Sequence, residues 1–428
     1  MKNKKINNNI YNYGIFIFFI WFFLSLYLYI DSLTGFFLWK YGLEIPLSQL
    51  WKGVILILAL TWSLFFSRSL FCFLIVLIIF LLSGPIVRLF QDGIGAGFVE
   101  SCIMALKALM PAIIIGYCNQ AQFDHPEFVS RGAPRVLWLC VGALVLNILL
   151  GIFGLGFTAY GTGETGGIGV VGFFPAGNEV SATFAILAGF VLMRGWQAQR
   201  RFYLLIALMV VGCGFLIATK AAIGAAILLS FCIPVAYRRG AWMKISPAML
   251  FLLLVALGLL TLAAIELWAV LELVGLSDRI LYIYENQGVI GILFSGRDVT
   301  INSIFSNLYE NLDLTKVFFG LGPTFLNQAS QKITAEVDPV DLYLWFGLPG
   351  VIYGFLFLLI VTYISMKAYS DGANRHGPGV LVINVTLVGI SIFAGHVVFG
   401  GMAGIVWAVL NALVILESRN IRGPKHVA

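Results

Sequence analysis

Long apolar stretches recur along almost the whole chain and limit the folds that it can adopt. Each is about 15–22 residues long, so a helix of this length crosses all or most of a hydrocarbon core about 30 Å thick. Only 11% of the residues are charged, whereas about a quarter are charged in a soluble domain. The sequence therefore predicts one membrane domain over residues 1–428, an all-α polytopic bundle of transmembrane helices.

Hydropathy places about twelve membrane spans in this bundle. They are expected at residues 12–31, 49–66, 69–84, 97–117, 134–154, 179–193, 203–217, 221–236, 247–268, 342–366, 379–399 and 402–416. The first stretch exceeds the apolar part of a secretory signal and lacks a convincing cleavage site, so we expect an uncleaved span.

The distribution of basic residues predicts the orientation of the bundle. With the N-terminus in the cytoplasm, 17 of the 26 lysines and arginines fall on cytoplasmic segments, in agreement with the positive-inside rule. Twelve spans then place both termini in the cytoplasm. Two long segments lie on the opposite side, a glycine-rich loop over residues 154–178 and one large loop over residues 269–341.

Two sequence patterns have simple structural explanations. Gly161, Gly163 and Gly166 match G-x-G-x-x-G, but a dinucleotide site needs a strand before this motif and a helix after it. Here the motif lies between two predicted spans, which favours a flexible loop. The six cysteines lie in or beside apolar stretches without metal-ligand spacing, as small buried hydrophobes do. With one histidine on the outer side, no protein metal site is predicted.

Two lysines are candidate anion ligands. Lys107 lies within a predicted span, where an unpaired ammonium is costly, so it should face a partner or a watery cavity. Glu100 lies on the same helix face, and a structural ion pair within the bundle is one explanation of Lys107; an anionic lipid headgroup is the other. Lys220 lies at an outer turn beside a helix N-terminus, which favours an anion such as phosphate. A lysine that only extends its ammonium to the interface is the alternative.

Four residues near the outer ends of the last spans carry acid–base groups. Asp338 before Pro339 is a good helix N-cap, and Asp341 suits the first turn of the same helix. Glu336 precedes this cap, where its carboxylate could act as a general base. His396 lies near the outer end of its span, and a satisfied core histidine is its simplest explanation.

The segment from Glu336 to Gly350 resembles the end of the large periplasmic loop in the O-antigen polymerase and ligase family. Ligases typically begin this segment with His-Asn, and Glu336 occupies the histidine position. The departure favours the polymerase branch, in which acidic E-x-D-x-x-D versions are familiar.

Three further segments resemble the same family in the same order along the chain. Residues 172–179 are similar to the family's segment with an asparagine, here Asn178, opening a mid-chain span next to Glu179. Residues 218–222 are similar to a ligase turn in which Lys220 matches an arginine. Residues 295–297 are similar to the loop arginine, here Arg297, that precedes a Gly-x-Gly.

This resemblance implies a Wzy-type polysaccharide polymerase of the bacterial inner membrane. The expected reaction is metal-independent glycosyl transfer from an undecaprenyl-pyrophosphate-linked oligosaccharide, with no cofactor and no nucleic acid. Glu336 and Arg297 are the expected catalytic residues. The expected substrate-binding residues are Lys220, Lys107, Asp338, Asp341, Asn178, Glu179 and His396. A chain-length regulator protein is a possible partner beside the lipid bilayer.

Two other functions stay open at this stage. A ligase would move the finished glycan from its lipid carrier to lipid A–core. A lipid-linked oligosaccharide flippase would place its polar groups near the bilayer midplane, often on broken helices of paired repeats. Only Lys107 fits that second pattern, because most acidic groups are predicted at or beyond the outer interface.

Overall fold

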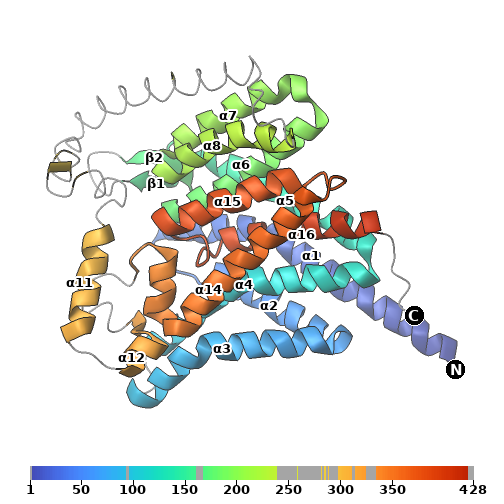
Figure 1. Ribbon diagram of the computed structural model, residues 1–428, viewed down its shortest axis with the longest axis horizontal. Coiled ribbons are helices and arrows are strands. Elements are labelled where there is room, and N and C mark those ends of the chain that lie inside the picture. The colour runs from blue at the N-terminus through green and yellow to red at the C-terminus, as the bar shows by residue number, and fades with distance from the viewer. Residues whose placement is uncertain are drawn as a thin grey trace.

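The computed structural model describes residues 2–92, 96–160, 167–238, 297–310, 314–323 and 334–422, with residues 258, 281, 284, 285 and 288. These residues are almost all helical, and two short strands form the only sheet in the described ranges. The helices pack side by side as one bundle (Figure 1). The predicted all-α fold class is confirmed.

The long helices coincide with the predicted spans. They are α1 (Lys2–Tyr41), α2 (Leu47–Phe66), α3 (Arg68–Asp92), α4 (Ala96–Asp124), α5 (Pro126–Ile152), α6 (Gly177–Ala198), α7 (Tyr203–Ile217), α8 (Lys220–Tyr237), α14 (Asp338–Ser370), α15 (Gly377–Phe393) and α16 (Ala403–Arg422). In the described ranges, nine helices have the length and composition to cross a membrane, and α15 and α16 are shorter apolar helices. The chain is a multi-pass membrane protein. Of the predicted span 247–268, the structure describes residue 258 alone.

The two ends of the bundle differ. The start of α1 and the end of α16 lie at the same end, on the right of Figure 1. The opposite end carries the strands β1 (Phe157–Tyr160) and β2 (Ile168–Gly172) and the helices α11 (Arg297–Glu310) and α12 (Leu314–Phe319). This arrangement agrees with an even number of spans between the first and last helices. We call the end with β1 and β2 the outer end.

The glycine-rich segment is more ordered than expected. β1 and β2 pair antiparallel, with Thr158 opposite Val170 and Tyr160 opposite Ile168. Val171 is almost fully buried, and β2 packs against α5 and α7. The hairpin packs on the helices, a contact that the predicted external loop over residues 154–178 did not include. The G-x-G-x-x-G residues lie outside the described ranges.

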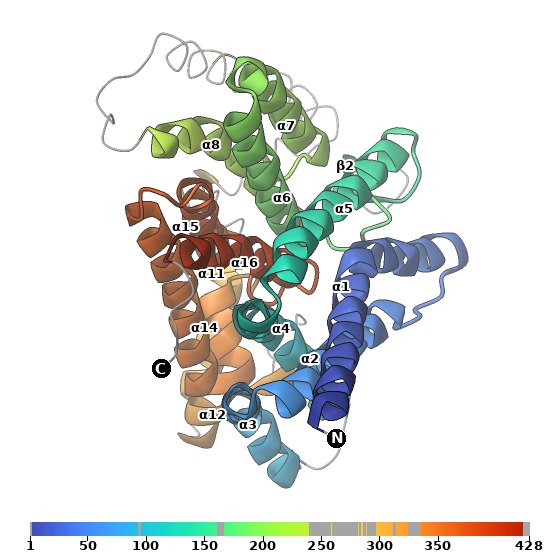
Figure 2. The same cartoon turned by 90° about the vertical axis from the view of Figure 1, so that its right-hand side faces the viewer.

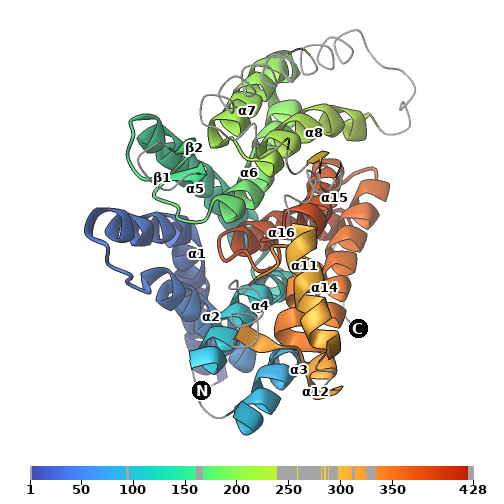
Figure 3. The same ribbon diagram turned by 90° about the vertical axis from the view of Figure 1, so that its left-hand side faces the viewer.

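The centre of the bundle is α16. It packs against α4, α5, α6 and α14, and its residues 403–414 are all buried. Figures 2 and 3 show it enclosed by these helices from two sides. An apolar helix surrounded on all sides buries its whole circumference rather than one stripe. α16 therefore forms the support against which the outer ends of α4, α6 and α14 are positioned.

A break in α14 shapes its outer half. Gly347 has φ 65° and ψ −147° inside this helix, a conformation that favours glycine. Beside the break, Arg88 of α3 donates Nη1 to the carbonyls of Phe319 and Gly320, both at 2.9 Å. Its Nη2 donates to the Trp345 carbonyl at 2.9 Å. One guanidinium thus fastens α3 to the end of α12 and to the broken α14.

Candidate functional site

Arg297 and Glu336 form an ion pair at the outer end of the bundle. Arg297 is the first residue of α11, and Glu336 lies just before α14. The Arg297 Nη2 and Nε atoms both donate to Glu336 Oε2, at 2.9 and 3.2 Å. The remaining Nη1 donates to the carbonyl of Phe393 at the end of α15, at 2.7 Å. The guanidinium therefore joins three segments, and the Glu336 side chain keeps 32% exposure.

Asp341 holds the backbone on both sides of Glu336. Its Oδ1 accepts from the Ala335 N–H at 2.6 Å, and its Oδ2 accepts from the Val337 N–H at 3.1 Å. Glu336 itself has φ 60°, a left-handed conformation that costs a non-glycine residue free energy and is concentrated at functional sites. The buried Asp341 carboxylate is therefore a positioning group for Glu336, more than a first-turn residue of its helix.

Asp338 does not cap its own helix, so that expectation is wrong. The N-cap of α14 is Val337, and Asp338 Oδ2 accepts from Ser391 Oγ and from the N–H groups of Val397 and Val398, each at 2.9 Å. The carboxylate turned away because Ser391 of α15 and the loop after α15 offer three donors in the buried interior. Through these bonds Asp338 fixes the loop that carries His396.

Asn178 and Tyr160 complete the surroundings of Glu336. Asn178, at the start of α6, directs its Nδ2 to Glu336 Oε2 at 3.4 Å. Tyr160, at the end of β1, lies close enough to interact electrostatically with Arg297 and Glu336. Desolvation of its hydroxyl raises the pKa of Tyr160, Glu336 raises it further and Arg297 opposes the rise. The phenol therefore stays protonated near neutral pH and can donate a hydrogen bond.

Lys220 supplies a second cation at the same end. The chain turns into α8 through Ala218, which has φ 60°, and Thr219, whose Oγ1 accepts from the Ala222 N–H at 3.1 Å as the N-cap. Thr219 also shares a hydrogen bond of 2.6 Å with Ser181 of α6. These contacts fix the first residue of α8, and Lys220 interacts electrostatically with Arg297. A second cation thus lies within electrostatic reach of Arg297.

Strained backbone conformations also occur in the segments that carry these candidate site residues. Within the described ranges, the non-glycine residues with positive φ are Ala218, Glu336 and His396. All three lie in the segments that carry candidate site residues. Such conformations persist only where the surrounding structure holds them. Their concentration here makes the outer ends of α8, α14 and α15 a candidate functional region.

Lys107 contacts a different partner from the one expected. Its Nζ lies 3.6 Å from Glu179 Oε1 of α6, and Glu179 Oε2 accepts from the Met402 N–H at 3.4 Å. His396 lies within electrostatic reach of Glu179. The structural ion pair is therefore formed across the bundle to α6, rather than along α4 to Glu100.

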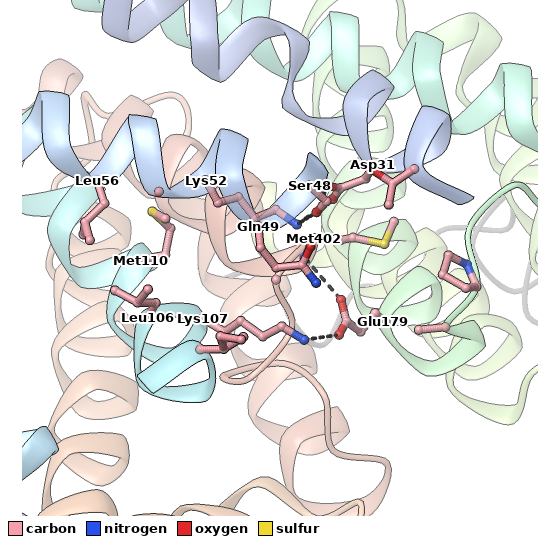
Figure 4. Close-up of a pocket in the computed structure, with 16 residues that line it drawn as sticks. Asp31, Ser48, Gln49, Lys52, Leu56, Leu106, Lys107, Met110, Glu179 and Met402 are labelled. Atoms are coloured by element: carbon pink, nitrogen blue, oxygen red, sulfur yellow. Dashed lines mark hydrogen bonds and ion pairs between the residues drawn. The ribbon is translucent and has the colours of Figure 1, made fainter. Parts of the chain in front are cut away.

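A cavity of about 230 Å³ opens beside this pair. It lies between α1, α2, α4, α6 and the loop before α16, and Asp31 and Lys52 line its far side (Figure 4). Lys52 Nζ lies 2.8 Å from Asp31 Oδ2 and 2.9 Å from Ser48 Oγ. The described residues that line this cavity include Lys107 but neither Arg297 nor Lys220. Lys107 therefore lines a cavity separate from the Arg297–Glu336 pair.

The start of α6 connects the two groups of charges. Asn178 faces Glu336, whereas its neighbour Glu179 faces Lys107. The sequence did not single out Asp31, Lys52 or Tyr160. A signal was present for Lys52, because it lies inside the apolar stretch 49–66 and the cost of an intramembrane charge applies to it as to Lys107. Tyr160 had no such signal, since the hairpin that places it could not be recognised.

No protein-family model matches the chain, and no curated protein matches it either. Among the residues that the structure describes, no three histidine, cysteine, aspartate or glutamate side chains lie together as metal ligands do.

Proposed function

We propose that the protein is a glycosyltransferase that polymerises undecaprenyl-pyrophosphate-linked oligosaccharide repeat units. The proposed location is the bacterial inner membrane, with the reaction at its periplasmic face. The products would be O-antigen, capsule or exopolysaccharide. The observation that carries the proposal is the Arg297–Glu336 pair at the outer end of the bundle, with Lys220 and Asn178 beside it.

These groups match the needs of glycosyl transfer from a lipid pyrophosphate. A hydroxyl of the acceptor sugar attacks the anomeric carbon of the donor sugar, and the bond from that carbon to the pyrophosphate oxygen breaks. Glu336 accepts the hydroxyl proton as general base. Arg297 and Lys220 stabilise the charge that develops on the leaving pyrophosphate. A planar guanidinium suits two phosphate oxygens at once.

The ion pair also suggests how the base is released. Arg297 occupies Glu336 Oε2 through two donors, so this oxygen is engaged by the guanidinium. A pyrophosphate competes for the same donors. Donor binding would therefore draw Arg297 from Glu336 and leave the carboxylate to the acceptor hydroxyl.

Deletion of the gene, followed by gel analysis of surface glycan, tests the proposal. A polymerase predicts single repeat units attached to lipid A, with long chains restored by the wild-type gene. Unattached long chains would support a ligase instead. Unchanged glycan would contradict both.

A further inference from the structure

The cavity beside Lys107 has a charged end and an apolar end. Asp31, Lys52, Lys107 and Glu179 line one part of it, whereas Leu56, Leu106 and Met110 line the other (Figure 4). α2 and α4 both begin at the outer end of the bundle, so Leu56 and Met110 lie deeper than the lysine that precedes each of them. The cavity is therefore polar toward the outer interface and apolar toward the membrane interior, as a bound lipid would require.

The charges at the polar end are balanced and close together. The Lys52 ammonium and the Lys107 side chain both lie beside Gly401, within 3.3 and 3.5 Å of the position of an added Cβ. Each lysine is paired with a carboxylate, Asp31 or Glu179. Side-chain exposures are 13% for Lys52 and 6% for Asp31. The Lys107 and Glu179 side chains keep 28% and 14% exposure. Charges withdrawn from water are costly, and these four groups suit a ligand that carries both an anion and hydrogen-bond donors.

We propose that this cavity binds a lipid phosphate whose headgroup carries hydrogen-bond donors. The phosphate contacts Lys52 and Lys107, the donors of the headgroup contact Asp31 and Glu179, and the hydrocarbon chain follows Leu56 and Met110. Gln49 and Thr34, which also line the cavity, add polar groups toward the outer end. Two lipids have this chemistry: phosphatidylethanolamine, through its ammonium, and a polyprenyl-phosphate-linked sugar, through its hydroxyls.

The site is separate from the one assigned to glycosyl transfer. Arg297 and Lys220 do not line it among the described residues. Lipid binding here requires no catalysis, so it can be tested whether or not the protein is a polymerase.

Native mass spectrometry of the full-length protein with added lipid tests the inference. The probes are phosphatidylethanolamine, phosphatidylcholine, which lacks headgroup hydrogen-bond donors, and a synthetic polyprenyl-phosphate-linked sugar. Lys52→Met removes one phosphate contact and should weaken binding by about tenfold. Because that change leaves Asp31 without its cation, Gly53→Leu is the second variant. Gly53 lines the cavity, and a Cβ there meets no atom within 4 Å.

Gly212→Leu in α7 is the matched control, since its Cβ also meets nothing within 4 Å and Gly212 does not line the cavity. We expect phosphatidylethanolamine to stay bound to the wild type and to this control, and to be lost from Gly53→Leu. Displacement by the polyprenyl-linked sugar would show that one site serves both lipids. Equal retention of lipid in all variants would overturn the proposal, and phosphatidylcholine binding as tight as phosphatidylethanolamine would overturn the role of the carboxylates.

Discussion

Arg297 makes the contacts on which the proposed chemistry depends. It holds Glu336 through Nε and Nη2 and is anchored by the carbonyl of Phe393 through Nη1. We predict that Arg297→Gln lowers the polymerisation rate by about two to three orders of magnitude, since it removes a donor to the leaving group. Arg297→Lys should recover little of this, because an ammonium lacks the planar fork. Turnover of purified protein in liposomes is the measurement.

Arg201→Gln is a suitable control for that series. Arg201 is exposed, and its guanidinium stacks on the neighbouring Phe202 ring. Its loss should leave turnover unchanged. An Arg297→Gln protein with wild-type turnover would remove Arg297 from the mechanism.

Asp341 offers a test of how Glu336 is positioned. Its carboxylate accepts from the Ala335 and Val337 N–H groups, and Asp341→Asn replaces one of these two acceptor oxygens by an amide NH₂. One buried N–H then lacks an acceptor, at a cost of about 1–3 kcal/mol. We predict a lower melting temperature and a reduced kcat with little change in KM. Asp371→Asn, in the turn after α14, is the control. A stability loss without any loss of kcat would assign Asp341 a structural role alone.

At single positions, the sequence predicted the members of the site better than their contacts. Arg297 and Glu336, 39 positions apart, were both named from their places in the loop, and the structure pairs them. The Asp338 carboxylate turns away from its own helix. This orientation could not be predicted, because its donors belong to α15 and to the loop after α15. Asp31 was missed because its partner Lys52 comes from another helix.

At the scale of helices, the role of the Arg88 hydrogen bonds beside the break in α14 can be tested. The guanidinium serves the carbonyls of Phe319, Gly320 and Trp345, and hydrogen bonds from a charged donor contribute about 1.5–3 kcal/mol. We predict that Arg88→Met lowers the thermal unfolding temperature by several degrees and reduces activity, since α12 and the outer half of α14 lose their connection to α3.

Arg68→Met is the matched control for Arg88→Met. Arg68 is the exposed first residue of the same helix, and its loss should leave the unfolding temperature unchanged. Equal melting of the two variants would show that the break in α14 is held without Arg88.

Helix positions followed from the sequence because hydrophobic length alone selects a membrane span. Their ends did not. The predicted span 379–399 extends beyond α15, which ends at Phe393. Gly395 and His396 both have positive φ, and Asp338 holds the segment after them. Residues 157–160 and 168–172 became strands because they pair with each other and pack on α5 and α7. These contacts are tertiary, so no local sequence pattern predicts them.

At the scale of the whole molecule, the orientation in the membrane can be measured. The basic residues predict that Arg201, Arg239 and Arg375 face the cytoplasm, whereas Glu164, Arg297 and Glu336 face outward. The structure places the start of α1 and the end of α16 together, away from β1 and α11 (Figure 1). Arg239 and Glu164 lie outside the described residues. Single cysteines are introduced at these positions in a cysteine-free background. An impermeant reagent added from outside should label positions 164, 297 and 336 and leave positions 201, 239 and 375 unlabelled. Labelling of positions 201 and 375 from outside intact spheroplasts would contradict the topology.

The central claim is that Glu336 is the base of a glycan polymerase, and one assay tests it most directly. Purified protein in liposomes is supplied with a synthetic polyprenyl-pyrophosphate oligosaccharide, and product lengths are read by mass spectrometry. Glu336→Gln keeps the side-chain shape and removes its basicity, so its rate should fall by about 10²–10⁴-fold. Glu44→Gln, at an exposed position between α1 and α2, should form long chains at the wild-type rate. Long chains made by Glu336→Gln at that same rate would contradict the account.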